Sequence, residues 1–259
     1  PSVRGERVFS VAFTEPEAGS DAAAIRTLAR KKSNVWQING KKHFISDGAF
    51  SDFFVITAVT DPEKGARGGI TAFIVDKDTP GFGIEREIPM LGGSRTYELV
   101  MDDMRLPQSQ VLGEVGEGFA PMQMRLTVRR LEMGARCIGM AERALKMMCE
   151  HTQQRETFGV MLSDRQAIQW WIADAATKIH TTRLLMYDAA RMAERGEDIR
   201  TAASMLKVYA TEMATEVLDH AMQSFGAMGM TRELPLAIMS QRVRLARIYE
   251  GPTEVHRMV

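Results

Sequence analysis

The sequence has 259 residues, with 33 basic and 33 acidic side chains. This balance argues against a strongly basic nucleic-acid-binding surface and against an acidic tail. No apolar run approaches the roughly 18 residues of a membrane span. Two isolated cysteines, Cys137 and Cys149, indicate a reducing compartment. The expected location is the cytoplasm, or a mitochondrial or peroxisomal matrix in a eukaryote. The chain starts at Pro1 without an initiator Met or a signal peptide, which we interpret as part of a longer sequence.

The first part of the chain, residues 1–112, carries short β-branched and aromatic runs separated by turns. They predict strands at 8–13, 35–38, 53–59, 70–75 and 97–101. The pair Asn39-Gly40 predicts a hairpin turn, because both residues tolerate positive φ. Short strands at this spacing predict an antiparallel β-sandwich or barrel rather than a parallel α/β sheet.

The second part, residues 113–259, changes to a helical period. One apolar face combines Met122, Leu126, Met133, Cys137, Met140, Ala144 and Met147. A second helix is expected from Ser163, where Gln166 would complete a capping box, to a stop near Gly196. A third is expected at 201–225, and Pro235 suits the first turn of a fourth. The pattern predicts an up-down four-helix bundle, and hence an α+β protein of two domains.

Most common catalytic signatures are missing from the sequence. It contains no P-loop, no G-x-S-x-G, no H-E-x-x-H, no C-x-x-C and no strand-G-x-G-x-x-G-helix unit. His43 and Asp47 lack a third ligand nearby, so we expect no metal site.

Three local segments carry groups suited to ligand binding or catalysis. Residues 14–21 (TEPEAGSD) combine Gly and hydroxyl residues that let backbone N–H groups approach a pyrophosphate. An ordinary turn explains the same residues equally well. Residues 41–48 (KKHFISDG) hold an aromatic and a hydroxyl on one strand face, suited to a flavin ring and its edge, or form a plain strand end. Residues 247–256 (RIYEGPTEVH) place a carboxylate before a Pro-started helix, where it is either a catalytic base or a solvated glutamate.

Together these segments resemble the acyl-CoA dehydrogenase family, from about Phe9 to Met258. The matching motifs are T-E-P-x-A-G-S-D, I-N-G-x-K-x-x-I-S-x-G, R-x-T-F-G and I-Y-E-G, in that order. Family members have an N-terminal helical domain, a middle β domain and a C-terminal four-helix domain. The resemblance implies that residues 1–112 form the middle domain and residues 113–259 the C-terminal domain.

The resemblance implies FAD as the cofactor. The residues expected to bind it are Thr14, Ser20, Phe44 and Ser46 within one subunit, and Arg155, Thr157, Phe158, Gln223 and Gly226 toward the FAD of a neighbouring subunit. Three positions depart from the common family pattern. Phe44 stands where most members have Trp, Ala227 replaces a Gly, and Pro252 replaces a Thr or Ser.

The resemblance also implies oxidation of an acyl-CoA thioester to the trans-2-enoyl-CoA. Glu250 is expected to abstract the α-proton while hydride passes from the β-carbon to flavin N5. The residues expected to contact the substrate are Ser20, Arg130, Tyr249 and Gly251, with Arg130 equally suited to be a structural ion of the bundle. Expected partners are electron-transfer flavoprotein as acceptor and further copies of the chain in a homodimer or homotetramer, without nucleic acid.

Two further hypotheses remain open from the sequence. One is an acyl-CoA oxidase on the same scaffold, since packing decides oxygen access; nitroalkane oxidation is disfavoured because it goes with Asp at the base position. The other is a non-catalytic nucleic-acid-binding relative, which the balanced charge disfavours.

Overall fold

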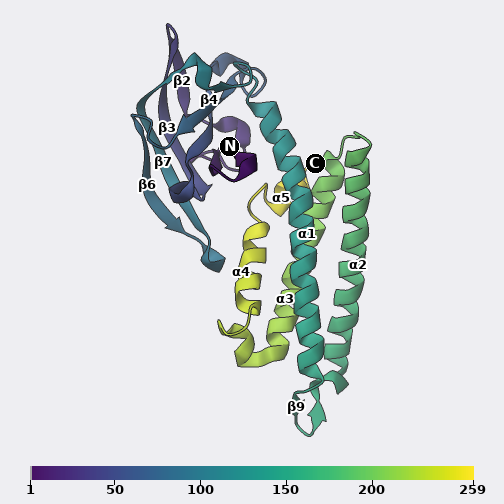
Figure 1. The fold of residues 1–259 in the computed structure, drawn as a ribbon. Coiled ribbons are helices and arrows are strands. Elements are labelled where there is room, and N and C mark those ends of the chain that lie inside the picture. Colours follow the sequence, from purple (N-terminus) through teal and green to yellow (C-terminus); the bar gives the residue numbers. More distant parts are fainter. Residues whose placement is uncertain (1) are drawn as a thin grey trace. The chain divides into compact units, whose positions relative to one another are not determined.

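A computed structural model describes residues 2–259. They form two compact units, one up to Met124 and one from Arg125 to Val259, which are considered separately (Figure 1). The domain boundary at residue 112 remains a prediction.

The first unit is built on an eight-stranded sheet within residues 2–124. The strands are β1 (Phe9–Ala12), β2 (Leu28–Lys32), β3 (Val35–Ser46), β4 (Phe53–Val59), β5 (Ile70–Asp76), β6 (Phe82–Pro89), β7 (Arg95–Pro107) and β8 (Val111–Leu112). Their order is β6-β7-β3-β2-β4-β5-β8, and β1 pairs with β4. Most strand pairs are antiparallel. The exceptions involve β4, which pairs in parallel with β1 and, through the single pair Leu28 and Val59, with β2.

Alternating side chains of these strands form the core of the first unit. Ile38, Phe54, Ile56, Phe73 and Leu99 are completely buried. β-Branched and aromatic side chains fit such a half-buried pleated surface well, which explains why these runs form strands.

The hairpin predicted at Asn39-Gly40 is wrong. Strand β3 continues through both residues, and its pairing with β7 shifts register there. Gly40 is required by close packing instead, since a Cβ would lie 2.7 Å from the Cα of Thr27. The turn between β2 and β3 lies earlier, where Ser33 has a φ of 57°.

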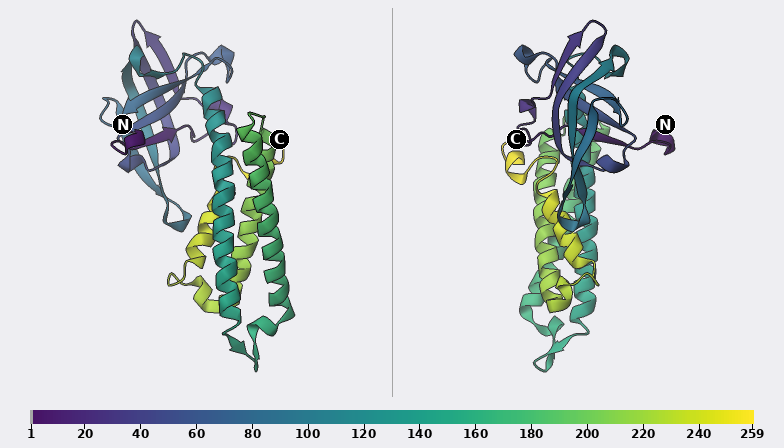
Figure 2. Two further views of the ribbon diagram at one scale, coloured as in Figure 1. Left: turned by 45° about the vertical axis from the view of Figure 1, so that its right-hand side comes forward. Right: turned by 90° about the vertical axis from the view of Figure 1, so that its left-hand side faces the viewer.

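The second unit is a bundle of helices. The helices are α1 (Phe119–Thr152), which begins before the unit does, α2 (Gln166–Glu194), α3 (Arg200–Phe225), α4 (Leu236–Ala246) and the short α5 (Thr253–His256). Helices α1, α2 and α3 run side by side, and α4 packs on α3 (Figures 1 and 2). One apolar core joins α1 to α4. A sheet unit followed by a helical unit confirms the α+β fold class.

The observed helix ends test the start and stop residues predicted from the sequence. Gly196, with a φ of 73°, follows the end of α2, and Pro235 directly precedes α4, as expected. The capping box at Ser163 is wrong, because residues 162–164 form a separate 3-10 turn and α2 begins at Gln166 without a side-chain cap. The main-chain carbonyl of Ser163 instead accepts a hydrogen bond from the Gln169 side chain.

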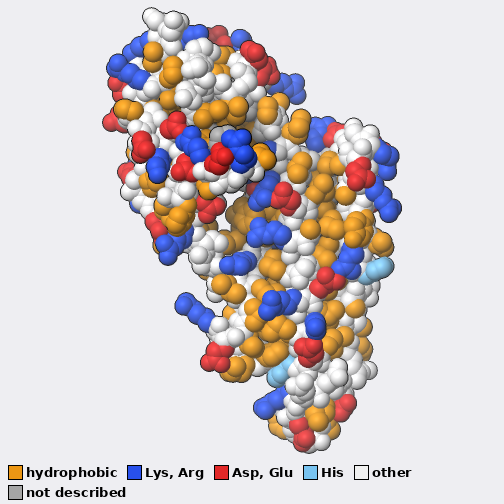
Figure 3. Space-filling model, in the orientation of Figure 1, with side chains coloured by type: hydrophobic (Ala, Val, Ile, Leu, Met, Phe, Trp, Pro, Cys, Tyr) orange, Lys and Arg blue, Asp and Glu red, His pale blue; other side chains and the backbone are white. Residues whose placement is uncertain are grey.

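The face of each unit that is seen in Figure 3 mixes charged and hydrophobic side chains. Large exposed apolar side chains of α2 include Trp170, Leu184 and Tyr187. Within residues 2–259 no helix is long and apolar enough to cross a bilayer, and no group of three His, Cys, Asp or Glu side chains could hold a metal ion.

Candidate active site

Glu250 lies in the short link between α4 and α5 and has a left-handed backbone, with a φ of 56°. Six non-glycine residues within 2–259 share positive φ: Ser33, Phe44, Asp47, Asp103, Phe158 and Glu250. Such a conformation costs about 1–3 kcal/mol for a residue with a side chain, and it concentrates at functional sites. Three of the six are residues that the sequence assigned to the site.

The main chain of Glu250 is fixed through its carbonyl. Arg130 Nε donates to the Glu250 carbonyl at 3.2 Å, and His256 Nε2 lies 3.0 Å from the same oxygen. By contrast, no main-chain carbonyl within residues 2–259 accepts from the Glu250 N–H. The link therefore leaves one polar main-chain group available to a ligand.

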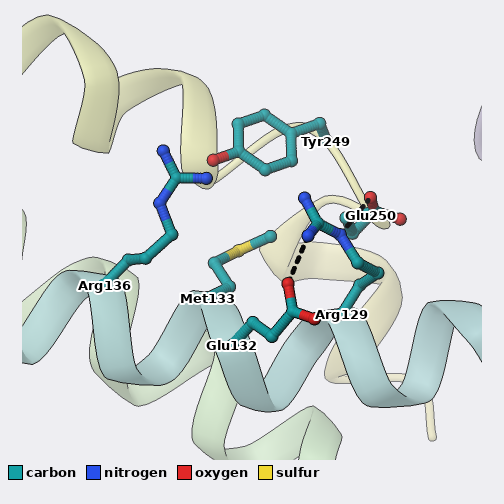
Figure 4. A pocket seen from close by; sticks show the side chains of 6 residues that line it. All are labelled: Arg129, Glu132, Met133, Arg136, Tyr249 and Glu250. Atoms are coloured by element: carbon teal, nitrogen blue, oxygen red, sulfur yellow. Dashed lines mark hydrogen bonds and ion pairs between the residues drawn. The ribbon is translucent and has the colours of Figure 1, made fainter. Parts of the chain in front are cut away.

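The carboxylate of Glu250 lines a small hollow of about 10 Å³ within the second unit. The lining residues are Arg129, Glu132, Met133, Arg136, Tyr249 and Glu250 (Figure 4). The Glu250 side chain is 16% exposed, and its Oε1 lies 3.9 Å from Arg129 Nε. Arg129 also pairs with Glu132 one turn along α1. The Tyr249 ring lies over Met133 and turns its hydroxyl toward the Arg136 guanidinium (Figure 4).

Two buried polar side chains lie behind the link. Lys207 of α3 is completely buried and donates to the main-chain carbonyls of Arg247, at 3.2 Å, and of Gly251. The His256 ring bridges the Glu250 carbonyl and the Ser204 hydroxyl, which lies 3.0 Å from Nδ1. A carbonyl can only accept, so Nε2 carries the proton and Nδ1 accepts from the serine.

The pKa values around the link are shifted mainly by burial. Burial lowers the pKa of Lys207 to about 8 and that of His256 to about 4. It also lowers the pKa of Arg130 and raises that of Tyr249. The imidazole of His256 is therefore neutral at physiological pH.

In the first unit, Thr14 belongs to a tight turn tied to β3. The His43 N–H donates to the Thr14 carbonyl at 2.8 Å, and the backbones of Glu15 and Ala18 exchange hydrogen bonds of 3.0 and 3.1 Å. Ser20 follows this turn and is exposed. The turn thus brings Thr14, one of the expected cofactor residues, to the side of β3.

The buried Glu15 carboxylate anchors the turn from within. It accepts from the backbone N–H groups of Arg26 and Thr27 and from Lys42 Nζ. Lys42 also donates to the Phe13 carbonyl at 3.2 Å. Burial by itself would raise the pKa of Glu15, but the Lys42 ammonium and the hydrogen bonds from Thr27 and Arg26 together hold that pKa below its usual value.

Phe44 occupies a β-bulge in β3. The register with β7 shifts between Lys42 and Ile45, and Phe44 has a φ of 56° and a 47% exposed side chain. Bulges of this kind re-aim a side chain beside a site. Ser46, also exposed, lines a hollow of about 350 Å³, a volume within the range of small-molecule pockets. An outward aromatic ring and a nearby hydroxyl fit the face and edge of a flavin.

Arg155, Thr157 and Phe158 lie on a separate hairpin, β9 (Glu156–Thr157) and β10 (Val160–Met161), after α1. Its turn, Phe158-Gly159, has two positive φ values, and the Phe158 side chain is 98% exposed. A solvated aromatic in a strained conformation at a hairpin tip suits contact with another molecule.

Gln223 and Gly226, at the end of α3, lie at the same end of the bundle as this hairpin. Phe225 stacks on His151 near the end of α1, with ring centroids 4.0 Å apart. Arg130, which contacts Glu250, is separated from His151 by about 30 Å of helix at 1.5 Å per residue. The structure therefore divides the expected site residues of the second unit into two distant groups.

Sequence reasoning missed Lys207, Ser204 and His256 as neighbours of Glu250. A signal for Lys207 was available, because it interrupts an apolar run of α3 between Leu206 and Ala210. A lysine on a buried helix face requires acceptors.

A sheet unit joined to a helical bundle with a strained glutamate link defines a recognisable class of protein. The family model for the acyl-CoA dehydrogenase middle domain matches residues 10–104, and that for the acyl-CoA dehydrogenase C-terminal domain matches residues 116–259. The chain belongs to the acyl-CoA dehydrogenase family.

Individual relatives agree with this assignment. The chain is 44% identical over 257 residues to (R)-benzylsuccinyl-CoA dehydrogenase of Thauera aromatica, covering 98% of this chain but only 63% of that relative. Butyryl-CoA dehydrogenase from Megasphaera elsdenii matches in structure with a TM-score of 0.94 and 37% identity, covering 100% of this chain and 68% of that chain. The structure of PigA with FAD and proline has a TM-score of 0.95 and 30% identity, covering 99% and 67%.

Proposed function

We propose that this chain supplies the flavin-binding and proton-abstracting parts of an FAD-dependent acyl-CoA dehydrogenase. The observation that carries the proposal is the Glu250 link. It combines a carboxylate that lines a hollow with a main-chain N–H that has no main-chain acceptor within residues 2–259.

These two groups suit the chemistry of an acyl thioester. Its α-proton is weakly acidic, so a base must be positioned against it while a donor stabilises the developing enolate oxygen. The Glu250 carboxylate takes the α-proton, and the Glu250 N–H donates to the thioester oxygen. The electron pair of the Cα–H bond forms the double bond as the β-hydride leaves, and FAD, when bound, would supply the acceptor for that hydride.

FAD is proposed as the cofactor because the first unit offers groups that fit it. Phe44 presents an outward ring, Ser46 a hydroxyl beside a hollow, and the turn around Thr14 and Ser20 exposed polar groups. The FAD named in the PigA structure, a relative of the same fold, supports this choice.

An assembly of at least two copies follows from the same reasoning. If Arg155, Phe158 and Gln223 bind FAD, their separation of about 30 Å of helix from the neighbourhood of Glu250 directs them to another subunit's cofactor. The exposed Phe158 ring and the exposed apolar side chains of α2 supply surface for such contacts. Electron-transfer flavoprotein remains the proposed acceptor.

The testing experiment is anaerobic mixing of the complete FAD-loaded protein with a panel of acyl-CoAs of different length, branching and charge. Bleaching of the flavin band would support dehydrogenation, and the rates would rank the substrates. A flavin that no acyl-CoA bleaches would contradict the proposal.

A further inference from the structure

Three side chains, from α1, α3 and α5, hydrogen-bond to the main chain around Glu250. Arg130 and His256 contact the carbonyl of Glu250 itself. Lys207 contacts the carbonyls of Arg247 and Gly251. Close packing also requires glycine at position 251, because its φ is 94° and a Cβ would lie 2.8 Å from His256 Nε2. Fixing these peptide planes fixes the directions of the Glu250 side chain and N–H.

Stability of the bundle does not explain the lysine. Placing an ammonium in an apolar core costs free energy, and an apolar side chain of similar volume often stabilises a protein as well or better. Lys207 is surrounded along α3 by buried Ala203, Leu206 and Ala210, where a methionine would pack without any desolvation cost. What the ammonium adds is two hydrogen bonds to the link.

His256 is likewise more than a packing residue. Its ring is 5% exposed, and each nitrogen has a specific partner, the Ser204 hydroxyl on α3 and the Glu250 carbonyl. The ring thereby ties the link to a long, rigid helix. The His256 N–H donates to the Glu250 carbonyl and does not engage the Glu250 N–H.

We propose that Lys207 and His256 are positioning residues for proton abstraction, which hold the main chain around Glu250 so that its carboxylate and its N–H face one thioester. The inference rests on the proposed function and deepens it. Loss of either contact relaxes the strained φ of Glu250, and a displacement of 1 Å in a catalytic group can cost about a hundredfold in rate.

The test is single-turnover flavin reduction in the complete FAD-loaded protein, with Lys207→Met compared with wild type. The reduction rate at saturating acyl-CoA should fall about 10- to 100-fold, while the dissociation constant for acyl-CoA changes by less than about threefold. The thermal midpoint should change little, because the removed desolvation cost of the ammonium offsets the loss of its two hydrogen bonds to main-chain carbonyls. A purely structural role would lower the midpoint and leave the rate of the folded fraction unchanged.

His256 gives a second pair of variants that does not depend on the folding of Lys207→Met. His256→Gln keeps an N–H donor for the Glu250 carbonyl and should retain most of the rate, whereas His256→Leu should lose it. Lys178→Met is the matched control, because Lys178 pairs with Glu216 on the outside of α2 and α3. It should reduce its flavin at the wild-type rate.

Wild-type rates in both Lys207→Met and His256→Leu would overturn the inference and leave the proposed function intact. A wild-type protein whose flavin no acyl-CoA reduces would overturn both.

Discussion

The Lys42 ammonium lies 2.7 Å from a carboxylate oxygen of Glu15, and neither side chain is more than 3% exposed. This ion pair fixes the turn that carries Thr14 against β3. Removing one partner of a buried pair leaves an uncompensated charge, which typically costs about 3–5 kcal/mol.

We therefore expect Lys42→Met to lower the free energy of unfolding by about that amount and to loosen FAD. The neighbouring Lys41→Met is the control, since Lys41 is 45% exposed, pairs with Glu85 and Glu98, and should cost less than about 1 kcal/mol. Urea titration of both variants measures the difference. An equal loss of unfolding free energy in the two variants would show that the buried ion pair stabilises the fold no more than the exposed one.

The protonation of His256 should make the protein acid-sensitive. Burial first, and then the charges of Arg130 and Lys207, lower the pKa of His256 from 6.5 to about 4, despite the hydrogen bond to the Glu250 carbonyl. Between these values the unfolded chain binds the proton and the folded protein does not, so stability is lost as pH falls from 6.5 toward 4.

His256→Gln removes this group and should flatten the corresponding part of the stability curve. The measurement is the free energy of unfolding of both proteins at several pH values between 4 and 7. Parallel curves for wild type and variant would contradict a depressed pKa of His256.

Phe158 should serve binding rather than folding. Asn tolerates positive φ better than Phe does, so Phe158→Asn should keep or slightly raise the stability of the hairpin. Because an exposed aromatic anchor is lost, the variant should retain less FAD and dissociate more readily. Sedimentation velocity recorded at the protein and flavin bands tests both effects; an unchanged assembly with full flavin would exclude a contact role for Phe158.

The sequence predicts the architecture well because hydrophobic period and turn residues are local signals. The strand-rich first part, the helical second part, the stop at Gly196 and the start near Pro235 all follow from such signals. The two errors have different causes: a tertiary contact decides the path at Gly40, whereas at Ser163 a local 3-10 turn over residues 162–164 precedes the start of α2. Gly40 is needed because Thr27 approaches its backbone, a contact that no local pattern records.

The site is predictable only in part, for the same reason. Motif order brought Glu250, Phe44 and Phe158 to attention, and each proves to have a strained backbone. The assembly behind Glu250 joins residues about fifty positions apart, including Ser204 with His256. Only the packing of α5 on α3 brings them together.

The central claim is that Glu250 is the base. Glu250→Gln keeps the size of the side chain and the main-chain N–H, so acyl-CoA and FAD should still bind while proton abstraction is lost. Arg129, the nearest ionisable neighbour of the carboxylate, is a cation and cannot replace it. Glu254→Gln is the control, because that carboxylate is exposed in the same segment and should be dispensable.

The most direct measurement is single-turnover flavin reduction of wild type, Glu250→Gln and Glu254→Gln at a saturating concentration of the best acyl-CoA. We predict a loss of about 10²–10⁴ in rate or more for Glu250→Gln, with Glu254→Gln unchanged. Reduction of the Glu250→Gln flavin within a few-fold of the wild-type rate would contradict the assignment of Glu250 as the base.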